Sequence, residues 1–147
     1  MITLKNCNLI DVVEFLDKVE LPPKASRARS KLNRLFISKV GELNNDEREL
    51  LEKYGKRGED GKLIEDNGNF TLVPETAAEF HQEKAALFDE VTSVNVDEIE
   101  DKLGALIEAL ENSDMKLSGK DAEALDVLLD ALEAETAAKA ENLKTAE

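Results

Sequence analysis

The chain has 147 residues, of which 41% are hydrophobic and 35% charged, and this size fits one domain with a single modest core. Only 4% of the residues are aromatic and none is Trp, so we expect an aliphatic core and few stacking surfaces for bases or sugars. The formal net charge of -14 repels phosphate backbones and anionic lipid, which argues against a general nucleic-acid-binding or membrane-surface protein.

The beginning of the chain predicts a strand and a short helix. Residues Ile2 to Lys5 have the character of a short strand, and Asn8 is a suitable cap for a helix over residues 9–19. Approximate helical spacing is shown by Ile10, Val13 and Leu16. Neither a secretory leader nor a run of about 18 apolar residues is evident, so we expect a cytoplasmic protein.

A long amphipathic helix is predicted from Lys24 to Tyr54. Its apolar residues recur at intervals of three and four, Gly41 and residues 44–46 are weak helix formers that could kink or divide it, and Gly55 is a natural residue to follow its end. These residues form its apolar stripe: Ala28, Leu32, Leu35, Phe36, Val40, Leu43, Leu50, Leu51 and Tyr54.

The clearest local signal is a β-hairpin. Residues 62–66 and 69–73 flank Asn67-Gly68, a pair that suits a type I′ turn. An isolated hairpin is marginal, so we expect a third strand or a helix beneath it, and residues 2–5 or 92–96 could supply that strand.

Three further helices are expected after Pro74. Ala77, Phe80, His81, Lys84, Phe88 and Val91 trace one helix, and Asp97 with Glu100 resembles a capping box that starts the next. Ser118 with Asp121 opens the last helix. The predicted fold is therefore α+β and predominantly α. One domain covers residues 1–133, and residues 134–147 form a solvated, frayed helical tail.

The residue types that perform catalysis are scarce. His81 is the only histidine and is expected to be a packing or surface residue, and Cys7 is a lone cysteine that is expected to be buried and structural. We therefore expect no enzyme and no catalytic residue. A deep pocket at His81 lined by at least two carboxylates would favour an enzyme instead.

Two loops superficially suggest a ligand. Residues 55–62 resemble a phosphate loop, but the glycine spacing is one residue too long and Leu63 replaces the magnesium-binding hydroxyl. The acidic residues and asparagines between Glu59 and Asn69 lack the spacing of a calcium loop, and turn formation explains them. No cofactor, no metal and no small-molecule substrate are expected. Glu98, Asp101, Glu108 and Glu111 are expected to form a solvated face.

The most informative segment is basic. Residues 1–57 carry 12 Lys and Arg against 9 Asp and Glu, whereas residues 58–147 carry 7 against 24. At about 100° per residue, one face of the long helix collects Lys24, Arg27, Lys31 and Arg34. Arg29 falls beside the apolar stripe, and we expect it to be partly buried and held by a carboxylate of a later helix.

Three interpretations of this basic face remain open. It could neutralise the acidic helices within the chain or in a second copy, dock onto an acidic partner protein, or contact nucleic acid, which the net charge disfavours. The residues assigned to partner binding are Lys24, Arg27, Arg29, Lys31 and Arg34.

Several segments together resemble an uncharacterised family of short proteins that phages and prophages of Gram-positive bacteria encode, domain-of-unknown-function family 1617. Besides the opening strand and helix, the resemblance rests on Leu21 to Lys24, Ser26-Arg27, Arg29, Leu32 to Val40, Glu49 to Tyr54, Asp60-Gly61-Lys62, Glu79-Phe80, Leu117-Ser118-Gly119 and Leu132-Glu133. Ser26, Arg27 and Arg29 would be marked positions of this family. The resemblance implies a viral setting in a bacterial host and no catalytic residues, and it does not extend to the Ala/Glu/Lys-rich end.

The expected function is protein interaction in the phage cycle, such as an accessory or chaperone-like role in virion assembly. The alternative is an acidic inhibitor of a host or defence nucleic-acid-binding protein, in which the acidic half imitates the charge of DNA. Partner identity and oligomeric state do not follow from the sequence.

Overall fold

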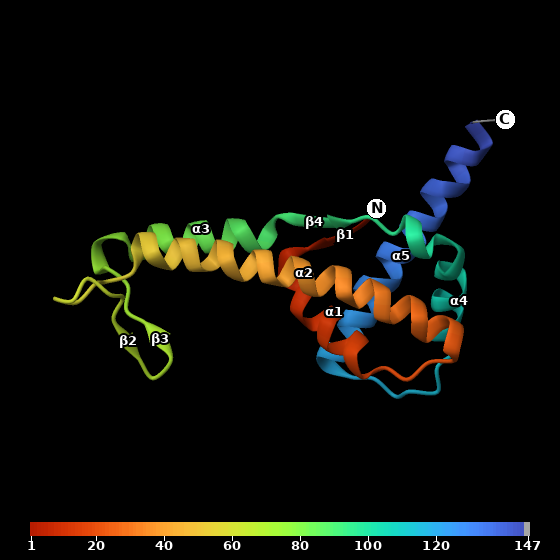
Figure 1. Cartoon of the computed structure of the whole chain (residues 1–147), viewed down its shortest axis with the longest axis horizontal. Coiled ribbons are helices and arrows are strands. Elements are labelled where there is room, and N and C mark those ends of the chain that lie inside the picture. Colours follow the sequence, from red (N-terminus) through yellow and green to blue (C-terminus); the bar gives the residue numbers. More distant parts are fainter. Residues whose placement is uncertain (146–147) are drawn as a thin grey trace.

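The computed structural model describes residues 1–145, with side chains described through residue 143. The chain forms a helical body and a long arm that extends from it (Figure 1). The arm consists of residues 44–89, and the body contains the remaining elements. This architecture confirms the predicted α+β class, in which helices predominate and the sheets are small two-stranded antiparallel pairs.

The first sheet lies in the body. Its two strands are the two segments that were each expected to support the hairpin, and they pair with each other instead. Strand β1 (Ile2–Lys5) pairs antiparallel with β4 (Val91–Val94), with Ile2 opposite Val94. Alternation along β1 buries Ile2 and Leu4, while the hydroxyl of the exposed Thr3 lies 2.7 Å from that of Ser93. The prediction that one of these strands supports the hairpin was therefore wrong. Each contributes its apolar face to the body core instead.

Helix α1 (Asn6–Lys18) begins earlier than predicted and has no side-chain cap, so Asn8 does not cap it. Leu9, Val12, Phe15 and Leu16 form its buried face, and Ile10 is exposed. Cys7 is also exposed, which corrects the prediction of a buried structural thiol. The face that turns to the core is set by Leu9, Val12, Phe15 and Leu16, and positions 7 and 10 lie off this face.

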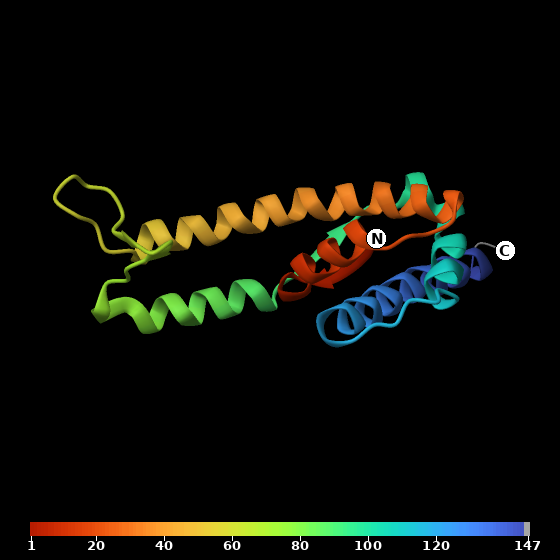
Figure 2. The ribbon, with the colours of Figure 1, turned by 90° about the horizontal axis from the view of Figure 1, so that it is seen from below.

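Helix α2 (Pro23–Tyr54) is a single unbroken helix of 32 residues, about 48 Å long. Pro23 lies in its first turn, where a missing N–H costs nothing. Gly41 does not divide it. Its first half buries Ala25, Ala28, Leu32 and Phe36 in the body, and its second half leaves the body to form one side of the arm (Figure 2).

The arm ends in the predicted hairpin. Strands β2 (Glu65–Asp66) and β3 (Asn69–Phe70) are shorter than predicted, and Asn67 and Gly68 have the positive φ values of 52° and 81° that the turn requires. Isolated bridges from Gly55 to Leu72 and from Arg57 to Leu63 connect the tip to the end of α2. The hairpin therefore rests on the end of a helix.

Helix α3 (Ala77–Asp89) follows the short 3-10 helix η1 (Pro74–Thr76) and packs against α2 along the arm. The buried Phe80 contacts Tyr54 edge-to-face, with ring centroids 6.2 Å apart. Few other arm residues are fully buried, so the arm depends on contacts between only two helices.

The junction of arm and body is held by Asn6, a buried polar residue. Its amide nitrogen Nδ2 donates to the carbonyl of Leu87 at 2.9 Å, its backbone N–H donates to the carbonyl of Glu90 at 2.9 Å, and its Oδ1 accepts from the hydroxyl of Thr92. One side chain thereby connects α1 to the end of α3 and to β4.

The body is completed by η2 (Asp97–Ile99), α4 (Glu100–Glu111) and α5 (Gly119–Thr145). No side-chain hydrogen bond caps η2 or α4, so the expected capping box is not formed. The apolar core is contributed by α1, α2, α4 and α5 with the sheet. Most of its side chains are aliphatic, as expected, but it also contains two aromatic rings, and it includes Phe15, Leu16, Leu32, Phe36, Ile99, Leu106, Leu128 and Leu132.

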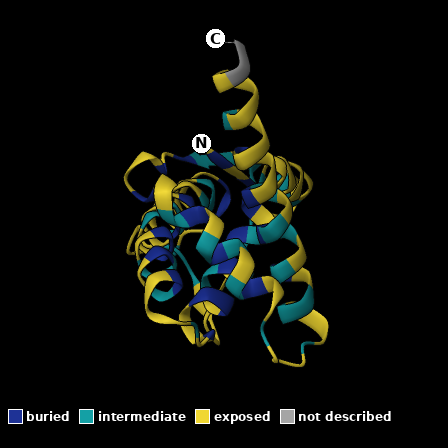
Figure 3. Cartoon of the chain, turned by 90° about the vertical axis from the view of Figure 1, so that its right-hand side faces the viewer, coloured by how far each residue is buried: buried dark blue, intermediate teal, exposed yellow. Residues whose placement is uncertain are grey.

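Helix α5 runs without a break into the segment predicted as a tail, and its last turns are exposed (Figure 3). Glu135 is an exception, because it is buried and accepts a hydrogen bond from the amino group of Met1 at 2.9 Å. The last two residues of the predicted tail, 146 and 147, lie outside the described residues.

Candidate functional site

Four cationic side chains form one exposed face on the first half of α2. This basic face consists of Lys24, Arg27, Lys31 and Arg34, all of them exposed. Their spacing of three, four and three residues spans about 15 Å along the helix. The buried positions of the same turns point elsewhere, into the body. The structure therefore brings together four of the five residues assigned to partner binding.

The basic face has no counter-charge in direct contact. Within the described residues, none of its four cations lies within 4.0 Å of a carboxylate oxygen. A hollow of about 470 Å³ brings Lys31 and Arg34 near Asp97 and Glu98, so some longer-range attraction exists within the chain. Within the described residues, the basic face therefore forms no ion pair with the acidic helices of its own chain, and neutralisation by a second copy stays open.

Lys102 of α4 extends the basic face across to a second helix. It lines a hollow of about 410 Å³ together with Arg27, Lys31 and Arg34, and the hydroxyl residues Ser26 and Ser30 complete the lining. The nearest carboxylate to Lys102 is that of its neighbour Asp101, at 3.7 Å. Sequence reasoning missed Lys102, because its position beside α2 depends on how α4 packs.

Arg29 has a different role from the other four. It is partly buried as predicted, but a carboxylate does not hold it. Its Nη1 donates to the carbonyl of Leu16 at 3.0 Å, and its Nη2 donates to Oγ of Ser26 at 2.8 Å. Leu16 lies in the last turn of α1, where backbone carbonyls lack partners within the helix. Arg29 therefore positions α2 against the end of α1.

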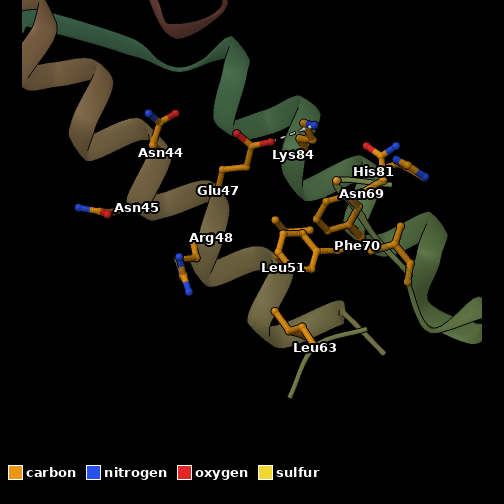
Figure 4. Close-up of a pocket in the computed structure, with 13 residues that line it drawn as sticks. Asn44, Asn45, Glu47, Arg48, Leu51, Leu63, Asn69, Phe70, His81 and Lys84 are labelled. Carbon is orange, nitrogen blue, oxygen red and sulfur yellow. Dashed lines mark ion pairs between the residues drawn. The ribbon is translucent and has the colours of Figure 1, made fainter. Parts of the chain in front are cut away.

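The arm carries a hollow of about 580 Å³ between α2, the hairpin and α3 (Figure 4). Apolar side chains, among them Leu51 and Phe70, lie at its centre. Glu47 is the one carboxylate residue in its lining, and Lys84 pairs with it at 3.0 Å. His81 is exposed and contacts Phe80 edge-to-face, with ring centroids 5.4 Å apart. The hollow therefore holds His81 and one carboxylate residue, Glu47, whose carboxylate is already paired with Lys84.

Comparison with known proteins identifies the family. The model of a family described as "Protein of unknown function (DUF1617)" matches residues 1–141. The chain belongs to this family. No curated protein and no solved structure matches the chain.

The acidic side chains of this DUF1617 family member form no metal-binding cluster in the described residues, where no group of three or more His, Cys, Asp or Glu is arranged to hold a metal ion. In the tip loop, Oδ1 of Asp60 accepts from the backbone N–H of Lys62 at 3.1 Å, which is the turn function expected of that residue.

One pair of carboxylates departs from this pattern. A hydrogen bond to Glu111 and its negative charge raise the pKa of Glu133, which lies on the neighbouring helix. The expected solvated acidic residues Glu98, Asp101, Glu108 and Glu111 are all exposed. Helices α4 and α5 therefore present a carboxylate-rich surface in this family member.

No helix in the described part of this protein combines the length and the apolar character needed to cross a bilayer.

Proposed function

We propose that this protein is a non-enzymatic phage protein that acts through protein–protein interaction, as an accessory or chaperone-like factor in virion assembly. The observation that carries the proposal is the basic face: four exposed cations without a direct counter-ion, in a chain whose net charge is -14. The phage setting rests on the sequence resemblance described above. The partner surface that fits the basic face is acidic.

An acidic protein surface fits this face better than nucleic acid does. The negative charge of the rest of the molecule opposes the approach of a long polyanion, whereas a local cluster of carboxylates can reach the basic face alone. Binding of single-stranded nucleic acid also relies on aromatic stacking, and the lining of the adjacent hollow contains no aromatic residue.

The non-enzymatic part of the proposal is supported by the positions of the reactive side chains. His81 is exposed, and the hollow that it lines includes only one carboxylate residue. That carboxylate, Glu47, is held in an ion pair with Lys84 at 3.0 Å. Cys7 lies on a different helix, α1, and is not part of that lining.

The test is an affinity purification from phage-infected cells with the tagged full chain. We expect phage structural proteins to copurify with the wild type and to be lost with Arg27→Glu combined with Lys31→Glu. Lys56→Glu combined with Lys62→Glu is the matched control, because it makes the same charge change in the tip loop at exposed positions. Equal recovery with the basic-face variant, or recovery of host enzymes alone, would contradict an assembly role through this surface.

A second candidate function is inhibition of a host or defence nucleic-acid-binding protein by imitation of DNA. It is favoured by the proximity of Glu111 and Glu133, because closely spaced negative charges resemble a row of phosphates. This candidate requires that binding to a basic host protein be abolished by high salt. Binding that resists salt would count against it.

A further inference from the structure

Helix α5 carries an acidic face with the same spacing as the basic face of α2. This acidic face consists of Glu123, Asp126, Asp130 and Glu133, all of them exposed. The intervals are again three, four and three residues. The two faces therefore have equal length, about 15 Å, and place four opposite charges at matching positions.

The acidic face points away from the core. The buried positions of α5 in the same turns are Ala124, Leu128 and Leu132. At about 100° per residue, the mean direction of the acidic face is roughly opposite to that of these buried positions. The four carboxylates thus stand on the solvent side of the helix.

The acidic face, like the basic face, lacks a direct counter-charge. Among the described residues, none of its four carboxylates lies within 4.0 Å of a cationic nitrogen. At one end, Glu111 adds a further negative charge beside Glu133. The two helices each leave a row of four like charges open to solvent.

The two faces do not meet within one molecule. Helix α1 packs against both α2 and α5 and lies between them in Figure 2. No ion pair joins the two faces in the described residues. Complementary faces that are separated in one molecule can pair between two molecules.

We propose that this protein self-associates by docking the basic face of α2 onto the acidic face of α5 in a second copy. The intervals of three, four and three residues are the same when either helix is followed from its other end. The opposite charges therefore match whether the two helices run parallel or antiparallel. Antiparallel pairing is favoured, because it also opposes the two helix dipoles. Lys102 beside the basic face and Glu111 beside the acidic face add one pair of charges at the margin.

This inference goes beyond the proposed function, because it assigns a role to a second surface. It also has a consequence for the first. An acidic partner protein and a second copy compete for the same basic face, so partner binding releases the associated copy.

The association is expected to be weak and sensitive to salt, because its contacts are exposed charges and because the local attraction must exceed the repulsion between two copies that each carry a net charge of -14. In sedimentation velocity with the purified full chain, the apparent dissociation constant should weaken by at least about tenfold between roughly 50 mM and 500 mM salt. A protein that remains monomeric at low salt, at concentrations up to the highest soluble one, overturns the inference.

Charge-reversal variants test the role of each face separately. Arg27→Glu with Lys31→Glu should abolish association, and so should Asp126→Lys with Asp130→Lys. Mixing these two variants should restore it, because each then supplies the charge that the other lacks, and this rescue also shows that both are folded. Association that persists in either variant alone, or that fails to return on mixing, overturns the inference.

Two control variants change the net charge equally at the arm tip. Lys56→Glu with Lys62→Glu matches the basic-face variant, and Glu59→Lys with Asp60→Lys matches the acidic-face variant. Both controls should associate as the wild type does, and loss of association in either overturns the assignment to these faces. Because the experiment uses the purified protein alone, its failure is distinct from failure to capture a phage partner.

Discussion

Replacing Arg29 should distinguish the structural arginine of α2 from the exposed arginines that we propose to bind a partner. Arg29→Met keeps much of the length of the side chain but removes the donors to the Leu16 carbonyl and to Oγ of Ser26. Hydrogen bonds from a charged group contribute about 1.5–3 kcal/mol each, and partial exposure of Arg29 reduces that contribution. We expect a loss of about 1–3 kcal/mol in the free energy of unfolding.

The matched control for this prediction is Arg27→Met, two residues earlier on the same helix. Arg27 is exposed and makes no ion pair among the described residues, so its removal should change the stability by no more than about 0.5 kcal/mol. Urea denaturation followed by circular dichroism measures both variants. For a chain near this size, each 1 kcal/mol also lowers the Tm by roughly 2–4 °C.

Binding to the proposed acidic partner should rank the two variants in the opposite way to their stability. Arg27→Met should weaken partner binding, whereas Arg29→Met should affect binding only as far as it unfolds the protein. Equal stability of wild type and Arg29→Met would refute the assignment of Arg29 as the residue that holds α2 against α1. An equal loss of stability in Arg27→Met would refute it as well.

Four other substitutions test the packing and the charges. Asn6→Leu should lower the free energy of unfolding by about 1–3 kcal/mol, because it leaves the Leu87 carbonyl and the Thr92 hydroxyl at the arm junction without their hydrogen bonds to Asn6. An unchanged midpoint of urea denaturation would contradict this role of Asn6. Gly55→Ala should destabilise the protein by about 1–3 kcal/mol, because the added Cβ would lie 2.5 Å from the backbone oxygen of Leu51. Gly41→Ala should instead stabilise α2 by about 0.5–1 kcal/mol, because its added Cβ would meet nothing within 4 Å. Thermal melts in which Gly55→Ala is the more stable variant would refute the reasoning. Glu133→Gln should raise stability at neutral pH, because Glu111 raises the pKa of Glu133 above its ordinary value of 4.5 and the ionised form opposes folding. The wild type should recover stability relative to this variant as pH falls through the raised pKa, and parallel pH profiles would argue against the interaction.

Local structure in this protein follows closely from local sequence. The strand at Ile2–Lys5, the long helix that ends at Tyr54 and the turn at Asn67-Gly68 depend on alternation, helical periodicity and the readiness of two residues for positive φ. Each of these properties acts within a few residues along the chain. For the same reason, the spacing of Lys24, Arg27, Lys31 and Arg34 was sufficient to place them on one face.

Contacts between distant segments were decided only by the tertiary structure. The pairing of β1 with β4, the exposure of Cys7 and the position of Lys102 beside α2 depend on how helices pack, and many packings satisfy the same apolar pattern. Arg29 illustrates the limit most clearly. Its partial burial followed from its place beside the apolar stripe, but its partner, a carbonyl at the end of α1, exists only where two helices meet. The sequence by itself determined which charges each helix presents, and the fold decided which of them remain without a partner.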